Sequence, residues 1–171
     1  MSRTSKKYSF DSVLEHAYVV HRDLTFSEVY YQETGGSVYD IGSFEPTLSG
    51  VIRKFPIAFF TGLFRPLPWE AKKLIVLLPS IENFIILIFI LSIAIKYGLI
   101  SLFREILRNK WSLYFIVFSI FFLFMVGLTS GNFGNLVRYK VPGIFFFYVI
   151  LFGTYGELRH NYETHHSRRR E

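Results

Sequence analysis

Residues 111–137 contain no Asp, Glu, Lys, Arg or His, and this run of 27 positions constrains the fold more than any other feature. At 1.5 Å per residue, a helix of about 20 residues crosses the roughly 30 Å hydrocarbon core of a bilayer. A soluble domain of this size rarely contains such a run. We therefore expect an all-α integral membrane protein, with one span over 111–129 that ends near Gly127 and the TSGN turn.

Two further apolar runs predict two more spans. The densest, residues 84–95, lies between Glu82 and Lys96 and predicts a helix over about 80–100, with Pro79 just before its start. The last run begins at Pro142 and predicts a helix to about 158. Its charge-free part has only 16 positions, 141–156, so this helix is expected to tilt little or to thin the bilayer locally.

The segments between and around the spans are polar or short. The ten apolar residues 55–64 are too few to cross a bilayer, and Pro66 and Pro68 prevent a continuous helix beyond them, which predicts an interfacial or re-entrant segment over 51–70. LFREIL, within 96–110, predicts a short amphipathic connector at the membrane surface. The expected organisation follows these boundaries: a polar, loop-rich region over 1–50 with one short helix near 9–24, the segment 51–70, a three-helix membrane region over 71–158, and a disordered basic tail over 159–171.

Charge and cysteine content exclude several classes of function. The net charge of +6 comes from Lys and Arg that cluster beside the apolar runs, as membrane anchors do, so we do not expect nucleic-acid binding. The chain has no Cys and therefore no thiolate metal site, disulfide or cysteine nucleophile. Its N-terminus lacks the apolar core of a signal peptide.

The distribution of basic residues predicts an orientation. Lys and Arg number four in 96–110, two in 131–140 and four beyond 156. By the positive-inside rule the first and third groups face the cytoplasm and 131–140 faces outward. Alternation of the spans then places residues 1–79 outside as well. The alternatives are the reverse orientation, a further membrane pass over 55–78, or a chain that forms the end of a longer protein.

The order of short motifs resembles the C-terminal part of multi-span bacterial membrane proteins of surface-polysaccharide synthesis, which are O-antigen polymerase-like or lipid-linked-sugar transferase-like. The matching pieces are GGSVYDIG, PTLSGVIRKFP, LFRPLPWEA, SIEN and GNFGNLVRYKVP, within about residues 33–152. The resemblance implies a bacterial inner-membrane protein that handles polyprenyl-linked glycans, and it implies more helices than this chain contains.

Arg138 is the first candidate binding residue, because it directly precedes the third span. A guanidinium at the membrane surface binds phosphate or pyrophosphate through paired hydrogen bonds, here of a polyprenyl-linked sugar. Alternatively, Arg138, Tyr139 and Lys140 anchor the helix end among the headgroups. Arg138 lies on the side expected to hold fewer basic residues, which favours a functional role.

Four other residues are candidates for substrate contact. Arg65 and Trp69, in FRPLPWEA, would contact phosphate and a sugar face, or else form an interfacial turn together with Glu70. Glu82 would pair with Arg65 or Arg138, act as a base, or lie exposed at the interface. Asp40, in a glycine-rich stretch, would cover a site or only close a local turn.

These residues predict binding rather than a defined reaction. We identify no catalytic set, cofactor motif or metal site, since His160, His165 and His166 lie in the expected flexible tail. The expected function is that of a component, or C-terminal fragment, of surface-polysaccharide synthesis or export that contacts lipid-linked glycan phosphate. The alternative is a non-catalytic membrane subunit that packs against a partner protein, with Ser119, Gly127, Gly153 and Gly156 as small contact residues.

Overall fold

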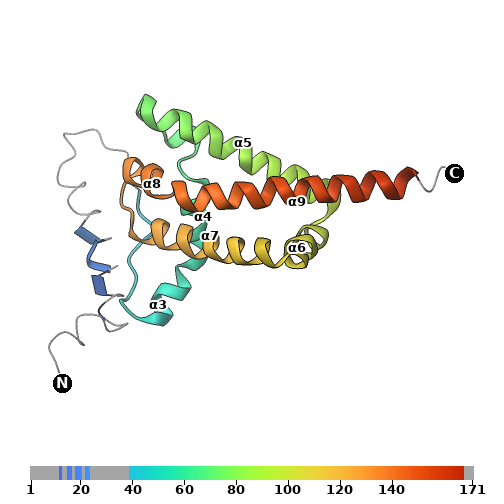
Figure 1. The fold of residues 1–171 in the computed structure, drawn as a ribbon. Helices are drawn as coiled ribbons and strands as arrows, with labels where there is room; N and C mark the ends of the chain where they lie inside the picture. Colours follow the sequence, from blue (N-terminus) through green and yellow to red (C-terminus); the bar gives the residue numbers. More distant parts are fainter. Residues whose placement is uncertain (1–11, 13–14, 17, 21, 24–38, 168–171) are drawn as a thin grey trace, which may run out of the picture.

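The computed structural model describes residues 39–167, with side chains to Thr164, together with residues 12, 15–16, 18–20 and 22–23. The described part of the chain is largely helical and has no β-strand. Three helices are long and apolar enough to cross a bilayer: α5 (Leu74–Tyr97), α7 (Lys110–Thr129) and α9 (Val141–Ser167). In Figure 1, α7 and α9 lie side by side and α5 leans toward α9 at one end. The predicted all-α membrane fold with three spans is confirmed.

The shorter helices gather at the two ends of this bundle. α3 (Leu48–Arg53) and α8 (Phe133–Tyr139) lie at one end, near the N-terminal half of α9, and α6 (Leu99–Arg108) lies at the other (Figure 1). The basic residues of 96–110 and Arg159 are therefore at the same end of the molecule, opposite residues 131–140.

The first span differs from its predicted bounds at both ends. α5 begins at Leu74, so Pro79 lies inside the helix and not before it. Pro79 falls in the second turn, where only one intrahelical hydrogen bond is lost. The helix stops at Tyr97 because Gly98 has φ 83°, a conformation that side-chain-bearing residues rarely adopt. Gly98 thus turns the chain directly into α6, the predicted amphipathic connector.

The second span is confirmed and the third is longer than predicted. The side chain of Asn109 caps α7 by accepting a 2.9 Å hydrogen bond from the Trp111 amide. α9 continues through Ser167, so the expectation of a disordered tail from 159 is wrong for the residues that the structure describes. An Arg159–Glu163 pair at 2.8 Å, one turn apart, supports this extension.

The short apolar segment is a helix, α4 (Phe55–Phe64), that packs against the second half of α7. Ala58 and Gly62 on α4 face Leu123 and Gly127 on α7, and a Cβ on either glycine would overlap a backbone carbonyl of the other helix. The backbones can therefore approach closely, as in other small-residue contacts between membrane helices. With ten residues, α4 is too short to cross a bilayer, as predicted, and it ends before Pro66 as expected, followed by the 3-10 turn η2 (Pro68–Glu70).

The region before residue 51 contributes to the core. Residues 39–45 are irregular, as predicted, but α3 begins at Leu48 inside the expected loop, capped by Thr47, whose hydroxyl accepts from the Gly50 amide at 3.1 Å. The described residues between 12 and 23 are helical, in agreement with the short helix expected there. Buried side chains of this region and Val51 of α3 join one core cluster with α4, α7 and α8; those before residue 51 are Tyr39, Ile41 and Phe44. A second cluster joins α5, α6 and α9.

Candidate functional site

Lys140 is the most deeply buried charged residue in the described part of the chain, with 2% of its surface exposed. It lies between α8 and α9, and its ammonium donates to the Arg65 carbonyl and to Asn83 Oδ1, both at 2.9 Å. The amide of Asn83, on α5, in turn donates to the Pro66 carbonyl at 3.1 Å. Lys140 and Asn83 thus join the end of α4 to both α5 and α9.

The sequence around Pro66 explains why these carbonyls need side-chain donors. α4 ends at Phe64, and Pro66 and Pro68 have no N–H groups to offer to nearby acceptors. A buried carbonyl without a donor costs roughly 1–3 kcal/mol. Lys140 and Asn83 supply the missing donors from distant parts of the chain.

Burial lowers the pKa of Lys140 from 10.5 to about 7, and the negative charge of Glu82 opposes this change. A buried ammonium loses hydration, which its two acceptors only partly replace. Burial therefore favours the neutral amine of Lys140 relative to a lysine in water.

Arg65 is held by an ion pair with Glu70. Arg65 Nε donates to Glu70 Oε1 at 2.8 Å and Nη2 lies 2.5 Å from the same oxygen, while Glu70 Oε2 accepts from the Leu67 amide at 2.9 Å. Both side chains are about one-fifth exposed. The prolines between them form a tight turn that brings the two residues together, so Glu70 of η2 largely balances the guanidinium charge of Arg65.

Two aromatic rings contact the guanidinium of Arg65. Its central carbon lies 5.0 Å from the ring centre of Tyr39 and 5.2 Å from that of Phe133, and these rings stack on each other at 4.9 Å. Such cation–π contacts contribute about 0.5–2 kcal/mol each. Burial also raises the pKa of the Tyr39 phenol, so this residue stays neutral. The segment around residue 39 is thereby joined to the start of α8.

These contacts hold α8 at both ends. Phe133 packs under Arg65 at its start, and Lys140 follows its last residue, Tyr139. Asn132 caps the helix by accepting from the Asn135 amide at 2.7 Å. On this fixed helix Arg138 is exposed and forms no ion pair with any described residue. It is the basic side chain that α8 presents outward.

The structure brings together some of the predicted residues and separates others. Arg65 joins the buried network and Arg138 lies outside it. Glu82 is exposed on α5, and its negative charge raises the pKa of Lys140. Arg65 forms its ion pair with Glu70 and not with Glu82. Trp69 is 71% exposed, with its ring 5.8 Å from that of Phe84.

Asp40 closes a local turn. Its Oδ1 accepts from the Gly42 amide at 2.6 Å, and Gly42 has φ 77°. This is the local hydrogen bond that the glycine-rich sequence allowed as the alternative to a role over a site.

Sequence reasoning missed Lys140 and Asn83 as partners and gave Glu70 no role of its own. A sequence signal exists for Asn83, since an amide within an apolar span must find a partner in the protein. Lys140 carries no such signal, because a lysine before a span is usually an exposed anchor. Its burial depends on the fold of α4.

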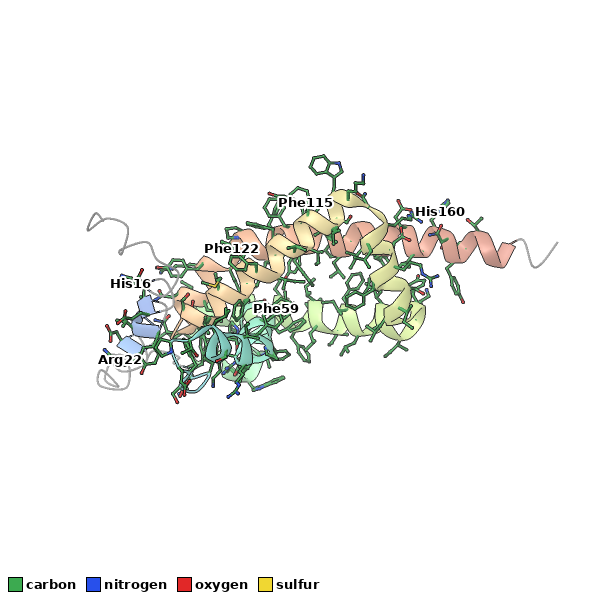
Figure 2. The ribbon with its side chains drawn as sticks, turned by 90° about the horizontal axis from the view of Figure 1, so that it is seen from below. His16, Arg22, Phe59, Phe115, Phe122 and His160 are labelled. Carbon is green, nitrogen blue, oxygen red and sulfur yellow. The ribbon has the colours of Figure 1, made fainter. Side chains whose placement is uncertain are left out.

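No metal site is evident in the described part of the chain, where no three His, Asp or Glu side chains converge. His160 lies exposed on α9 (Figure 2), and the side chains of His165 and His166 are outside the described residues. Comparisons of the chain with protein-family models, curated proteins and solved structures found no match.

Proposed function

We propose that the protein is a membrane component of surface-polysaccharide synthesis or export in the bacterial inner membrane, which binds the phosphate of a polyprenyl-linked glycan at the α8 end. The support is the exposure of Arg138 on a short helix that is fixed at both ends by Phe133 and Lys140. A guanidinium on such a rigid support binds phosphate with little loss of conformational entropy. The choice of a polyprenyl-linked glycan as the ligand rests on the resemblance of the sequence to proteins of surface-polysaccharide synthesis.

In this proposal Arg65 has a different role from Arg138. Its guanidinium is engaged by Glu70 and by two aromatic rings, so it positions α8 instead of contacting phosphate. Trp69, which lies within η2 and is largely exposed, can stack on a sugar face.

The test is binding of a polyprenyl phosphate to the full chain in nanodiscs of neutral lipid. Because a charged hydrogen bond contributes about 1.5–3 kcal/mol, Arg138→Gln should weaken binding about 10- to 150-fold. Arg53→Gln is the matched control, since Arg53 is also exposed, on α3, and the charge change is equal. Equal binding by Arg138→Gln and the unmodified chain would exclude the proposed contact, and equal weakening by both variants would indicate attraction by charge alone.

A second function, a non-catalytic subunit that packs against a partner, is favoured by one surface of α9. Ser119 and Gly127 are buried inside the bundle, but Gly153 and Gly156 have no atom within 4 Å of the position of an added Cβ. Phe152 beside them is 50% exposed. Small residues that leave such space permit close approach of another helix.

A photo-crosslinking residue at Gly153 tests this second function in native membranes. A partner helix on α9 should give one discrete crosslinked protein at position 153 and none from the exposed position Tyr114 on α7. Lipid adducts alone at Gly153 would contradict the proposed partner contact.

A further inference from the structure

α6 has apolar side chains on two faces, and the protein covers only one of them. Leu102 is buried and Ile106 is partly buried against α5 and α9. On the other face, four apolar residues are 57–77% exposed: Leu99, Ile100, Phe103 and Leu107. With Arg104 and Arg108 they line a shallow groove of about 720 Å³.

The chain turns place α6 across the end of the bundle. Gly98, with its positive φ, turns the chain out of α5, and Asn109 caps α7 where the chain re-enters. Figures 1 and 2 both show α6 transverse to α7 and α9. A helix in this position lies in the plane of the membrane surface, where an apolar face enters the acyl boundary.

Basic residues surround this exposed apolar face. Arg108 contacts Glu105 at 2.7 Å and Glu157 at 3.4 Å, and Lys96 lies over the Tyr97 and Tyr162 rings. Arg104 and Lys110, in contrast, are exposed and form no ion pair within the described part of the chain. Their charges are available to groups outside the protein.

Lys110 also lies at one end of a second groove, which follows one face of α7. This groove has a volume of about 500 Å³ and is lined by Lys110, Leu113, Tyr114, Val117, Phe118 and Phe121. From residue 110 to 121 the helix rises about 16 Å, close to half of a roughly 30 Å hydrocarbon core. The groove therefore offers a basic group at headgroup depth and an apolar path through one leaflet.

We propose that α6 and the first three turns of α7 form a binding face for anionic phospholipid. Arg104 and Lys110 contact the headgroup phosphates, the exposed face of α6 inserts at the acyl boundary, and the α7 groove holds an acyl chain. This face is at the opposite end of the molecule from the glycan-phosphate site proposed above, and it does not depend on that function. Each basic side chain near an anionic surface should favour the anionic lipid about fivefold.

Trp111, which follows Lys110 and is 72% exposed, reports directly on lipid at this face. The chain has two tryptophans, so Trp69→Phe leaves Trp111 as the single fluorophore. The full chain is reconstituted in phosphatidylcholine vesicles that contain brominated phosphatidylglycerol or brominated phosphatidylcholine, and quenching gives the relative binding constant of the two lipids. We expect several-fold preference for phosphatidylglycerol at low salt, and a loss of most of it on joint Arg104→Gln and Lys110→Gln substitution.

The matched control is joint Lys72→Gln and Lys73→Gln, which removes the same charge beside the start of α5, at the other end of the molecule. This variant should retain the preference. Equal quenching by both lipids, or full preference in the Arg104 and Lys110 variant, would overturn the proposal. A third result would also overturn the proposal: neither lipid quenches Trp111, and a cysteine introduced by Phe103→Cys forms a crosslink to another protein. A partner protein would then cover α6.

Discussion

A lysine that is 2% exposed needs hydrogen-bond acceptors, and Lys140 obtains them from a backbone carbonyl and from Asn83. Charged hydrogen bonds contribute about 1.5–3 kcal/mol each, which offsets much of the cost of burying the ammonium. The same contacts fix the turn between α4 and α5. At the scale of single residues, Lys140 is therefore the group on which the α8 end most depends.

Lys140→Met tests this dependence, because it retains the length of the side chain and removes its donors. We expect a loss of about 2–5 kcal/mol in the free energy of unfolding, since the Arg65 carbonyl and Asn83 Oδ1 are left buried without a donor. Unfolding of the detergent-solubilised protein in increasing sodium dodecyl sulfate measures the change. Lys72→Met, at an exposed lysine, should change stability by less than about 0.5 kcal/mol. Equal stability of the two variants would show that the Lys140 contacts contribute little.

The lowered pKa of Lys140 predicts a dependence of stability on pH. Between about pH 7 and 10.5 the unfolded chain binds a proton at this residue and the folded chain does not. Stability therefore rises with pH through this window and is lost as the pH falls toward 7. Comparing unfolding of the unmodified chain and Lys140→Met from pH 7 to 9 isolates the effect. The slope of stability against pH should be smaller in the variant, and parallel slopes would contradict the lowered pKa.

At the scale of single residues, the sequence predicted which side chains are important better than it predicted the residues that they contact. Arg65 was expected to be important and is part of the network, but its partner is Glu70, five positions away, because two prolines fold the chain back. Lys140 could not be predicted, since its contacts with residues 65 and 83 span 75 and 57 positions. The pattern of charged residues along the sequence indicates whether a residue lies near water or near lipid. Hydrogen bonds between residues so far apart in the sequence depend on how the helices pack.

At the scale of elements, two glycines permit the close contact between α4 and α7. Gly62 meets the backbone of Leu123, and Gly127 meets that of Ala58. The sequence predicted a short apolar segment at 55–64 and suggested Gly127 as a contact for a partner protein. Length and hydropathy identify such a segment, but they do not say which helix it packs against.

Gly127→Ala and Gly153→Ala form a matched pair that tests this contact. Both glycines lie within spans, and only Gly127 faces a neighbouring backbone. Gly127→Ala should destabilise the protein by about 1–3 kcal/mol through overpacking. Gly153→Ala should be neutral or stabilise by up to about 1 kcal/mol, because alanine favours the helix. Chemical unfolding measures both, and equal effects of the two variants would contradict the packing of α4 on α7.

At the scale of the whole molecule, helix lengths place the polar network of Lys140 and Asn83 toward one end of the bundle. Counting back from the charged end, Lys140 lies 16 residues before Gly156 and Asn83 lies 14 before Tyr97, or about 24 and 21 Å. Both groups therefore lie near the end of the bundle opposite Gly156 and Tyr97. The first turns of α5 extend beyond them and expose apolar side chains, with Leu74, Ile75 and Leu78 75–85% exposed.

Because α8 and α6 lie at opposite ends of the bundle, cysteines introduced on these two helices should be accessible to a reagent from opposite sides of the membrane. The chain has no native Cys, so single substitutions suffice. Gly134→Cys, exposed on α8, should react with a membrane-impermeant maleimide from outside the cell, and Arg104→Cys, exposed on α6, only after permeabilisation. The reverse result would invert the orientation. Labelling of both from one side would contradict three spans, because the two sites lie at opposite ends.

The length of α9 has a mechanical consequence. The helix continues 11 residues past Gly156, the last position of its charge-free part, which corresponds to about 16 Å. Tyr162 packs edge-on against Tyr97 at 5.7 Å, so the first turns of this extension are braced at the end of α5. The polar end of α9 thus continues the third span as one helix. A tilt of the third span would therefore move the polar end of α9 sideways, because both belong to one continuous helix.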